Sequence, residues 1–192
     1  MAASEGWTMP TGELMKGKKG LIMGVANANS IAWGIASQLA AQGAELAFTY
    51  LGESLERRVR PLAESVGAKL LIPADVTDDA SVAAGFEKAR AAHGQERLTV
   101  NCAGIATGQK TVSRKRETGE IRAHDMAQFE RTVSINLFGT FRVLSQSAAG
   151  MVTLEPMADG ERGLIVNTAS VAAQDGQIGQ AAYSASKGGV YA

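Results

Sequence analysis

A tyrosine and a lysine, Tyr183 and Lys187, lie four positions apart in the segment YSASK near the end of the sequence. On a helix this spacing places two side chains one turn apart on the same face. A phenol is a poor acid or base at neutral pH, and a neighbouring ammonium favours its phenolate form. Such a pair could deliver a proton to a carbonyl oxygen or take one from it. The same spacing also occurs where two residues are merely neighbours, so the pair needs support from the rest of the chain.

A second candidate site is the segment GVANANSIAWG, residues 24–34, which links an apolar run to a helical pattern. Backbone N–H groups at a helix N-terminus attract phosphate groups. Gly24 permits a tight turn, and the Ser30 hydroxyl can donate a hydrogen bond. The G-x-G-x-x-G fingerprint of dinucleotide-binding turns is absent. The segment therefore predicts either a phosphate loop or an ordinary turn in which Ser30 caps the helix.

The elements that must position these residues alternate in type. Five short apolar runs are typical of buried strands and cover residues 20–25, 45–50, 69–73, 98–102 and 164–168. Helical periodicity covers residues 31–42, 55–65, 81–92 and 126–151, and a last helix opens with Tyr183. This alternation predicts a parallel sheet between helices, with ligands bound outside the carboxyl ends of the strands. Residues 107–124 and 153–163 are expected to be insertions.

Size and charge restrict the function. With 192 residues, 45% of them hydrophobic, the chain predicts one domain, residues 19–192, after a flexible leader at residues 1–18. Nineteen basic residues balance nineteen acidic ones, which argues against nucleic acid or an anionic membrane as partner. The sequence has no secretory signal, no run of about 20 apolar residues and no metal-ligand set. With Cys102 as its one cysteine, a cytoplasmic protein without metal is expected.

Four motifs resemble those of the short-chain dehydrogenase/reductases. They are NCAG at residues 101–104, NLFG at 136–139, NTAS at 167–170 and YSASK at 183–187, in that order. The resemblance implies an α/β fold with a Rossmann-like, doubly wound parallel sheet in three layers. It also implies the catalytic residues: Asn136 holding a proton-relaying water, Ser170 orienting the substrate oxygen, Tyr183 as acid and base, and Lys187 bonded to the nicotinamide ribose.

Residues 20–80 resemble the cofactor-binding half of enoyl-acyl-carrier-protein reductases, in which a G-x5-S-I-A loop replaces the glycine fingerprint. The resemblance implies that the pyrophosphate lies on Gly24, Ser30 and Ile31 and the adenine beside Asp75 and Val76. The other implied cofactor-binding residues are Asn101, Ala103, Gly104, Tyr183 and Lys187. Arg57 and Arg58 could meet a 2′-phosphate or form a solvated helix face, and the second interpretation favours NAD(H) over NADP(H).

Residues 98–192 resemble a different branch, the 3-hydroxyacyl-coenzyme A dehydrogenases. Three residues separate Tyr183 from Lys187, as in carbonyl and alcohol oxidoreductases, whereas enoyl reductases have six. The spacing favours interconversion of 3-hydroxyacyl and 3-oxoacyl thioesters of coenzyme A or acyl carrier protein. Enoyl-thioester reduction and a catalytically silent nucleotide-binding scaffold are the alternatives. Natural divergence, or a chimera with its junction between Ser81 and Thr99, would explain why the halves resemble different branches.

Two further expectations concern the polar insertion and the C-terminal end. The insertion is basic, and its charges could meet coenzyme A phosphates or be merely solvated: Lys110, Arg114, Lys115, Arg116 and Arg122.

The resemblance implies that the family's chain continues past Ala192 with two further strands and a helical segment over the substrate. We therefore expect a truncated fold that lacks the last strands and has impaired activity. Its open strand edge would favour a homo-oligomer.

Overall fold

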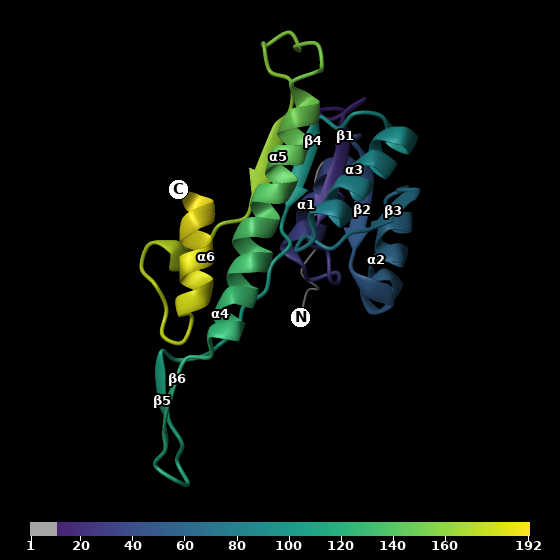
Figure 1. Ribbon diagram of the computed structural model, residues 1–192. Coiled ribbons are helices and arrows are strands. Elements are labelled where there is room, and N and C mark those ends of the chain that lie inside the picture. The colour runs from purple at the N-terminus through teal and green to yellow at the C-terminus, as the bar shows by residue number, and fades with distance from the viewer. Residues whose placement is uncertain (1–10) are drawn as a thin grey trace, which may run out of the picture.

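Five parallel strands form the centre of the computed structural model, which describes residues 11–192 (Figure 1). Their order across the sheet is β3-β2-β1-β4-β7. The strands are β1 (Lys19–Met23), β2 (Glu45–Tyr50), β3 (Leu70–Pro73), β4 (Leu98–Asn101) and β7 (Leu164–Asn167). Four of them lie within the predicted apolar runs, and β1 begins one residue before its run, at Lys19. The register pairs Leu21 with both Ala47 and Thr99. The predicted doubly wound parallel sheet is confirmed.

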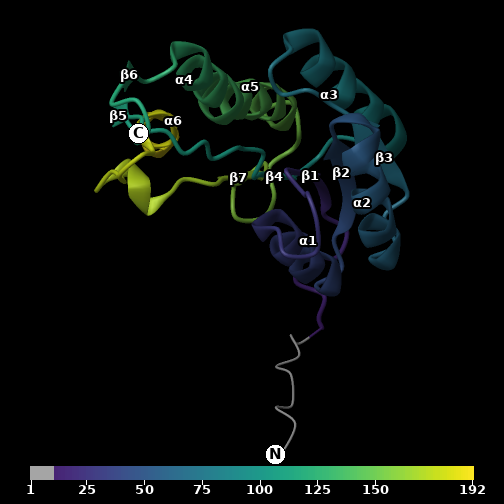
Figure 2. The same cartoon turned by 90° about the horizontal axis from the view of Figure 1, so that it is seen from below.

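Helices cover both faces of this sheet, as the view along it shows (Figure 2). The helical elements are α1 (Ile31–Ala41), α2 (Gly52–Ser65), α3 (Asp79–His93), α4 (Met126–Val133), η1 (Ser134–Phe138), α5 (Gly139–Met151), η2 (Val171–Ala173) and α6 (Ala181–Tyr191). Strand β2 shows how the layers are built, because side chains alternate across a strand. Leu46 and Phe48 pack in the core with α1 and α2, whereas Ala47 packs in the core with α3 and α5. The predicted three-layer arrangement is confirmed.

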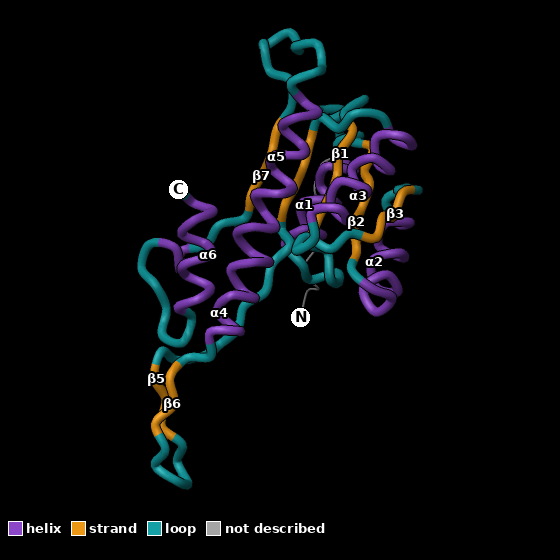
Figure 3. Tube along the Cα trace, viewed as in Figure 1, coloured by secondary structure: helices purple, strands orange, loops and turns teal. Residues whose placement is uncertain are grey.

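The helix expected at residues 126–151 is not one regular helix. It consists of α4, a turn of π-helix (η1) and α5, which follow one another along the edge of the molecule (Figure 3). Asn136 lies in the π-helical turn, and its carbonyl oxygen accepts a hydrogen bond from the Thr140 hydroxyl at 2.7 Å. Such wide turns are typical of functional positions in long helices. The apolar periodicity of the sequence does not reveal the interruption.

The polar segment at residues 107–124 contains an antiparallel hairpin of β5 (Val112–Arg114) and β6 (Ile121–Ala123), which projects from the body of the protein (Figures 1 and 3). Its basic residues are partly neutralised within the hairpin. Glu120 lies 2.9 Å from the Arg122 guanidinium and 3.8 Å from the Lys115 ammonium. The second expected insertion, residues 153–163, is a loop held by the Arg97 guanidinium, which donates to the carbonyl oxygens of Glu155 and Arg162.

Of the expected leader, residues 1–10 lie outside the described part of the chain. Residues 11–18 lead into β1 and are held against the end of α1, since the backbone N–H of Gly12 donates to the Ala41 carbonyl at 3.1 Å. None of the helices between residues 11 and 192 has the length and apolar character needed to cross a bilayer.

Candidate active site and nucleotide cavity

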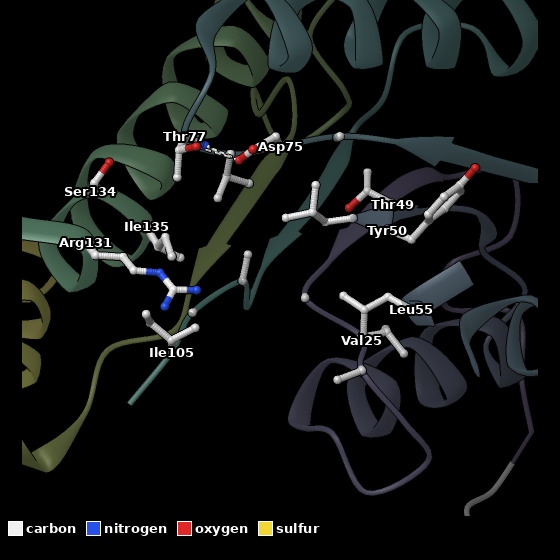
Figure 4. A pocket seen from close by; sticks show the side chains of 17 residues that line it. Val25, Thr49, Tyr50, Leu55, Asp75, Thr77, Ile105, Arg131, Ser134 and Ile135 are labelled. Atoms are coloured by element: carbon white, nitrogen blue, oxygen red, sulfur yellow. Dashed lines mark hydrogen bonds between the residues drawn. The ribbon is translucent and has the colours of Figure 1, made fainter. Parts of the chain in front are cut away.

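A cavity of about 540 Å³ opens at the carboxyl ends of β1, β2, β3 and β4 (Figure 4). It lies where the strand order reverses, because the chain proceeds from β1 toward β2 on one side and returns to β4 on the other. Ligands of doubly wound sheets bind at this switch point. Five of the predicted cofactor-binding residues line the cavity: Gly24, Asp75, Val76, Ala103 and Gly104.

Gly24 brings the turn after β1 into close contact with the turn after β4. Its φ is 96°, and a Cβ atom there would lie 2.3 Å from the backbone nitrogen of Ala103 and from the carbonyl carbon of Cys102. Only glycine fits this backbone without strain. The glycine therefore allows two cavity walls to meet.

The Ser30 side chain stabilises the conformation of the candidate phosphate loop that follows β1. Its hydroxyl oxygen accepts hydrogen bonds from the backbone N–H groups of Ala26 and Asn27, both at 3.0 Å. Although Ser30 occupies the N-cap position of α1, its side chain makes no capping hydrogen bond. The interpretation of Ser30 as a helix-capping side chain is therefore wrong. Ser30 and the exposed Ile31 follow cavity-lining residues in the sequence, but neither of them lines the cavity.

Asp75 and Val76 form the part of the cavity wall that follows β3. The Asp75 carboxylate accepts hydrogen bonds from the Thr77 backbone N–H at 2.9 Å and the Thr77 hydroxyl at 2.7 Å. Val76 packs against the backbone of α5, where a Cβ atom on Gly139 would lie only 2.8 Å from its Cγ2. Gly139 thus lets α5 approach the cavity wall.

Several lining residues were not singled out from the sequence. They are Thr49 and Tyr50 at the end of β2, Leu51 after it, Leu55 in α2, Ile105 after β4, and Arg131, Ser134 and Ile135 on α4 and η1. The pKa of Tyr50 is raised above its ordinary value of 10.0, mainly by burial and to a smaller extent by the nearby Glu56 carboxylate. The rule that ligands bind at the carboxyl ends of strands could have indicated the residues after β2.

The Tyr183–Lys187 pair lies on α6, beside the end of β7. Lys187 is 4% exposed, and its ammonium lies 5.9 Å from the centroid of the Tyr183 ring. The ammonium also donates to the carbonyl oxygen of Thr168 at 2.5 Å. Burial lowers the pKa of Lys187 below its ordinary value of 10.5, and the Cys102 thiol opposes that shift. The two residues are thus neighbours on one helix face, with the charge of Lys187 largely removed from water.

Asn136 connects the three segments around this pair. Its Oδ1 accepts a hydrogen bond from the Ile105 backbone N–H at 2.8 Å. Its Nδ2 donates to the Ile105 carbonyl at 2.9 Å and to the Ser186 hydroxyl at 3.0 Å. The buried amide therefore fastens the turn after β4 to η1 and to the face of α6 next to Lys187.

Gly104 joins the cavity to these predicted catalytic residues. It lines the cavity, and a Cβ atom at this position would meet Asn136 Oδ1 at 3.2 Å and Lys187 Nζ at 3.8 Å. Ser170 lies just before η2, which packs on α6, and its hydroxyl oxygen accepts a hydrogen bond from the Ala172 N–H at 3.2 Å. The structure thus brings the predicted catalytic segments to one end of the sheet, next to the cavity.

Asn101 and Cys102 are not among the residues that line the cavity. The buried Asn101 amide donates to the Thr140 carbonyl at 3.3 Å and ties β4 to α5. The Cys102 sulfur lies 2.9 Å from the Thr168 hydroxyl oxygen, and burial raises the pKa of the thiol. A thiol with a raised pKa is a weak nucleophile at neutral pH. These side chains hold the turn after β4 in place.

The reversed strand order, the cavity at the switch point and the adjacent Tyr183–Lys187 pair define a doubly wound α/β protein with a candidate ligand site at the carboxyl ends of its strands. The family model described as enoyl-(acyl carrier protein) reductase matches residues 24–192. The chain therefore belongs to this family, within the short-chain dehydrogenase/reductases.

Known relatives come from both branches of the family. The chain is 43% identical over 178 residues to a 3-hydroxyacyl-CoA dehydrogenase type-2 of Drosophila melanogaster, covering 92% of this chain and 66% of that protein. An enoyl-(acyl-carrier-protein) reductase of Anaplasma phagocytophilum, solved with NAD, is 32% identical with a TM-score of 0.78, over 95% of this chain and 64% of that one. The Bacillus cereus enoyl reductase, solved with NADP+, is 29% identical with a TM-score of 0.76, over 93% and 65%.

Proposed function

We propose that the protein is a nicotinamide-dependent oxidoreductase that interconverts 3-hydroxyacyl and 3-oxoacyl thioesters. The observation that carries the proposal is the Tyr183–Lys187 pair, one helical turn apart beside the nucleotide cavity. Its spacing of three intervening residues is the one expected for carbonyl and alcohol chemistry. The 43% identity to a 3-hydroxyacyl-CoA dehydrogenase type-2 supports the same substrate class. The chain spans about two thirds of that protein's length, 66%.

In the proposed reaction, a bound nicotinamide would supply the hydride or accept it. Tyr183 donates a proton to the carbonyl oxygen of the 3-oxoacyl group, and Lys187 favours the phenolate that remains. Ser170 holds the same oxygen by a hydrogen bond. Asn136 positions the face of α6 through Ser186 and the turn after β4 through Ile105. In the reverse direction Tyr183 removes the hydroxyl proton.

The proposed cofactor is NAD(H) rather than NADP(H). The cavity wall at the end of β2 contains Thr49, Tyr50, Leu51 and Leu55, none of which is basic. A 2′-phosphate next to this strand would lack the cationic partner that NADP-binding proteins supply. Arg57 pairs with Glu53 at 3.3 Å on the exposed face of α2 and does not line the cavity. Binding of NADH at least tenfold tighter than NADPH would support this preference, and the reverse order would overturn it.

Two alternatives follow from specific observations. Reduction of enoyl thioesters is favoured by the description of the matching family and by the Ser30 loop in the cofactor half. A silent nucleotide-binding scaffold would follow if the cavity binds a dinucleotide but no thioester is turned over. A homo-oligomer is also proposed, because β7 pairs on one side only within residues 11–192, and Phe138 and Phe141 are exposed.

The test is to follow oxidation of NADH at its absorbance band with acetoacetyl-coenzyme A and, separately, with crotonyl-coenzyme A. Oxidation with the acetoacetyl thioester supports the proposed function. Oxidation with the crotonyl thioester alone would assign enoyl reduction instead. NADH binding without turnover of either thioester would indicate the scaffold. Light scattering of the same samples measures the oligomeric state, and a monomer at all concentrations would contradict association.

A further inference from the structure

We propose that Arg131 binds a phosphate group of a ligand in the nucleotide cavity, an inference that depends on the proposed function. Arg131 lies in the last turn of α4 and, among the described residues 11–192, is the only basic one that lines the cavity. In the close view its guanidinium extends from the helix toward Ile105, into the space between the helix and the strand ends (Figure 4).

Helical spacing explains why Arg131 faces the cavity. Ser134 and Ile135 follow it by three and four positions and line the same cavity, and residues at this spacing share a helix face. The next residue, Thr132, fixes the orientation of the helix. Its hydroxyl lies 2.8 Å from the Thr107 hydroxyl and also donates to the Gln128 carbonyl at 2.8 Å.

The guanidinium has no anionic partner among residues 11–192. No hydrogen bond or ion pair connects its side chain to another residue in the described range 11–192. Asp75 supplies the only carboxylate that the described part of the chain places in the cavity lining, and it accepts two hydrogen bonds from Thr77. A cation directed into a largely apolar cavity is thus free to bind an anion. The planar guanidinium matches phosphate oxygens in a two-point contact.

Two phosphates could reach this position under the proposed function. One is the pyrophosphate of the dinucleotide, and the other is the phosphate of the pantetheine arm that carries the acyl thioester. Both present the same oxyanion to Arg131, and binding experiments separate them without requiring turnover.

The experiment compares the unmodified protein with Arg131→Gln and Arg131→Lys. NADH binding is measured by fluorescence. Binding of acetoacetyl-coenzyme A and of the N-acetylcysteamine thioester, which lacks phosphate, is measured by calorimetry. Loss of a charge-assisted hydrogen bond should weaken phosphate binding about tenfold or more in Arg131→Gln. Arg131→Lys retains the charge and should lose less. The matched control is Arg58→Gln, because Arg58 is exposed on α2 and does not line the cavity.

Weaker NADH binding in Arg131→Gln assigns the contact to the dinucleotide. Unchanged NADH binding with weaker binding of the coenzyme A thioester, but not of the N-acetylcysteamine thioester, assigns it to the pantetheine arm. Unchanged binding of both, an equal loss in Arg58→Gln, or a wild-type protein that binds neither ligand would overturn the inference. Arg131-dependent binding without oxidation of NADH would retain the inference and remove only the proposed activity.

Discussion

The Lys187 ammonium donates to the carbonyl oxygen of Thr168 at 2.5 Å while it lies 5.9 Å from the centroid of the Tyr183 ring. The last residues of the chain are thereby connected to the turn after β7, at the edge of the sheet. Because Lys187 is buried, its charge acts in a region of low dielectric, where its effect on a neighbouring phenol is greater than in water.

Replacement of Tyr183 by phenylalanine should abolish turnover while NADH binding is retained. The phenol supplies the transferred proton, and general acid catalysis contributes about 10² to 10⁴ in rate. Tyr191→Phe is the matched control on the same helix, since Tyr191 is exposed and its hydroxyl accepts a hydrogen bond from Gln174. The measurement is the rate of NADH oxidation at saturating thioester in both variants and in the wild type. Full activity in Tyr183→Phe would remove Tyr183 from the mechanism.

The lowered pKa of Lys187 should appear in the pH dependence of stability. Burial disfavours its charged form, so between the lowered pKa and 10.5 the unfolded chain binds more protons than the folded one. The free energy of unfolding of the wild type relative to Lys187→Met should therefore increase as pH rises through this window. Urea denaturation of both proteins at a series of alkaline pH values measures the difference. A constant or falling difference would show that the lysine is not desolvated in the folded state.

The glycine at the end of β1 provides a test of the cavity wall. Gly24→Ala should destabilise the protein by at least about 2 kcal/mol, because a φ of 96° and the contacts at 2.3 Å both oppose a Cβ atom. Gly34→Ala is the control, since a Cβ atom there meets nothing within 4 Å. It lies within α1 and should gain about 0.5 to 1 kcal/mol. Equal melting temperatures for the two variants would contradict the close approach.

Much of this arrangement is predictable because buried parallel strands have continuous apolar sequences, as in Leu21 and Ile22. The position of Lys187 beside Tyr183 follows from helical spacing alone. The π-helical turn at Asn136 could not be predicted, because the apolar pattern continues through it and the cause is a set of tertiary hydrogen bonds. The cavity-facing position of Arg131 likewise depends on how α4 is oriented against Thr107, far from it in sequence.

Asn136 should be necessary both for stability and for the alignment of α6. In Asn136→Ala the Ile105 N–H and carbonyl lose their side-chain partners, and an unsatisfied buried group costs about 1 to 3 kcal/mol. The exposed Asn29 is the control, and Asn29→Ala should change the free energy of unfolding by less than about 0.5 kcal/mol. Because the amide also bonds to Ser186, next to Lys187, kcat should fall in Asn136→Ala even at temperatures where the variant remains folded. Thermal denaturation and steady-state kinetics on the same samples separate the two effects. A variant of lowered stability but unchanged kcat would leave Asn136 a purely structural residue.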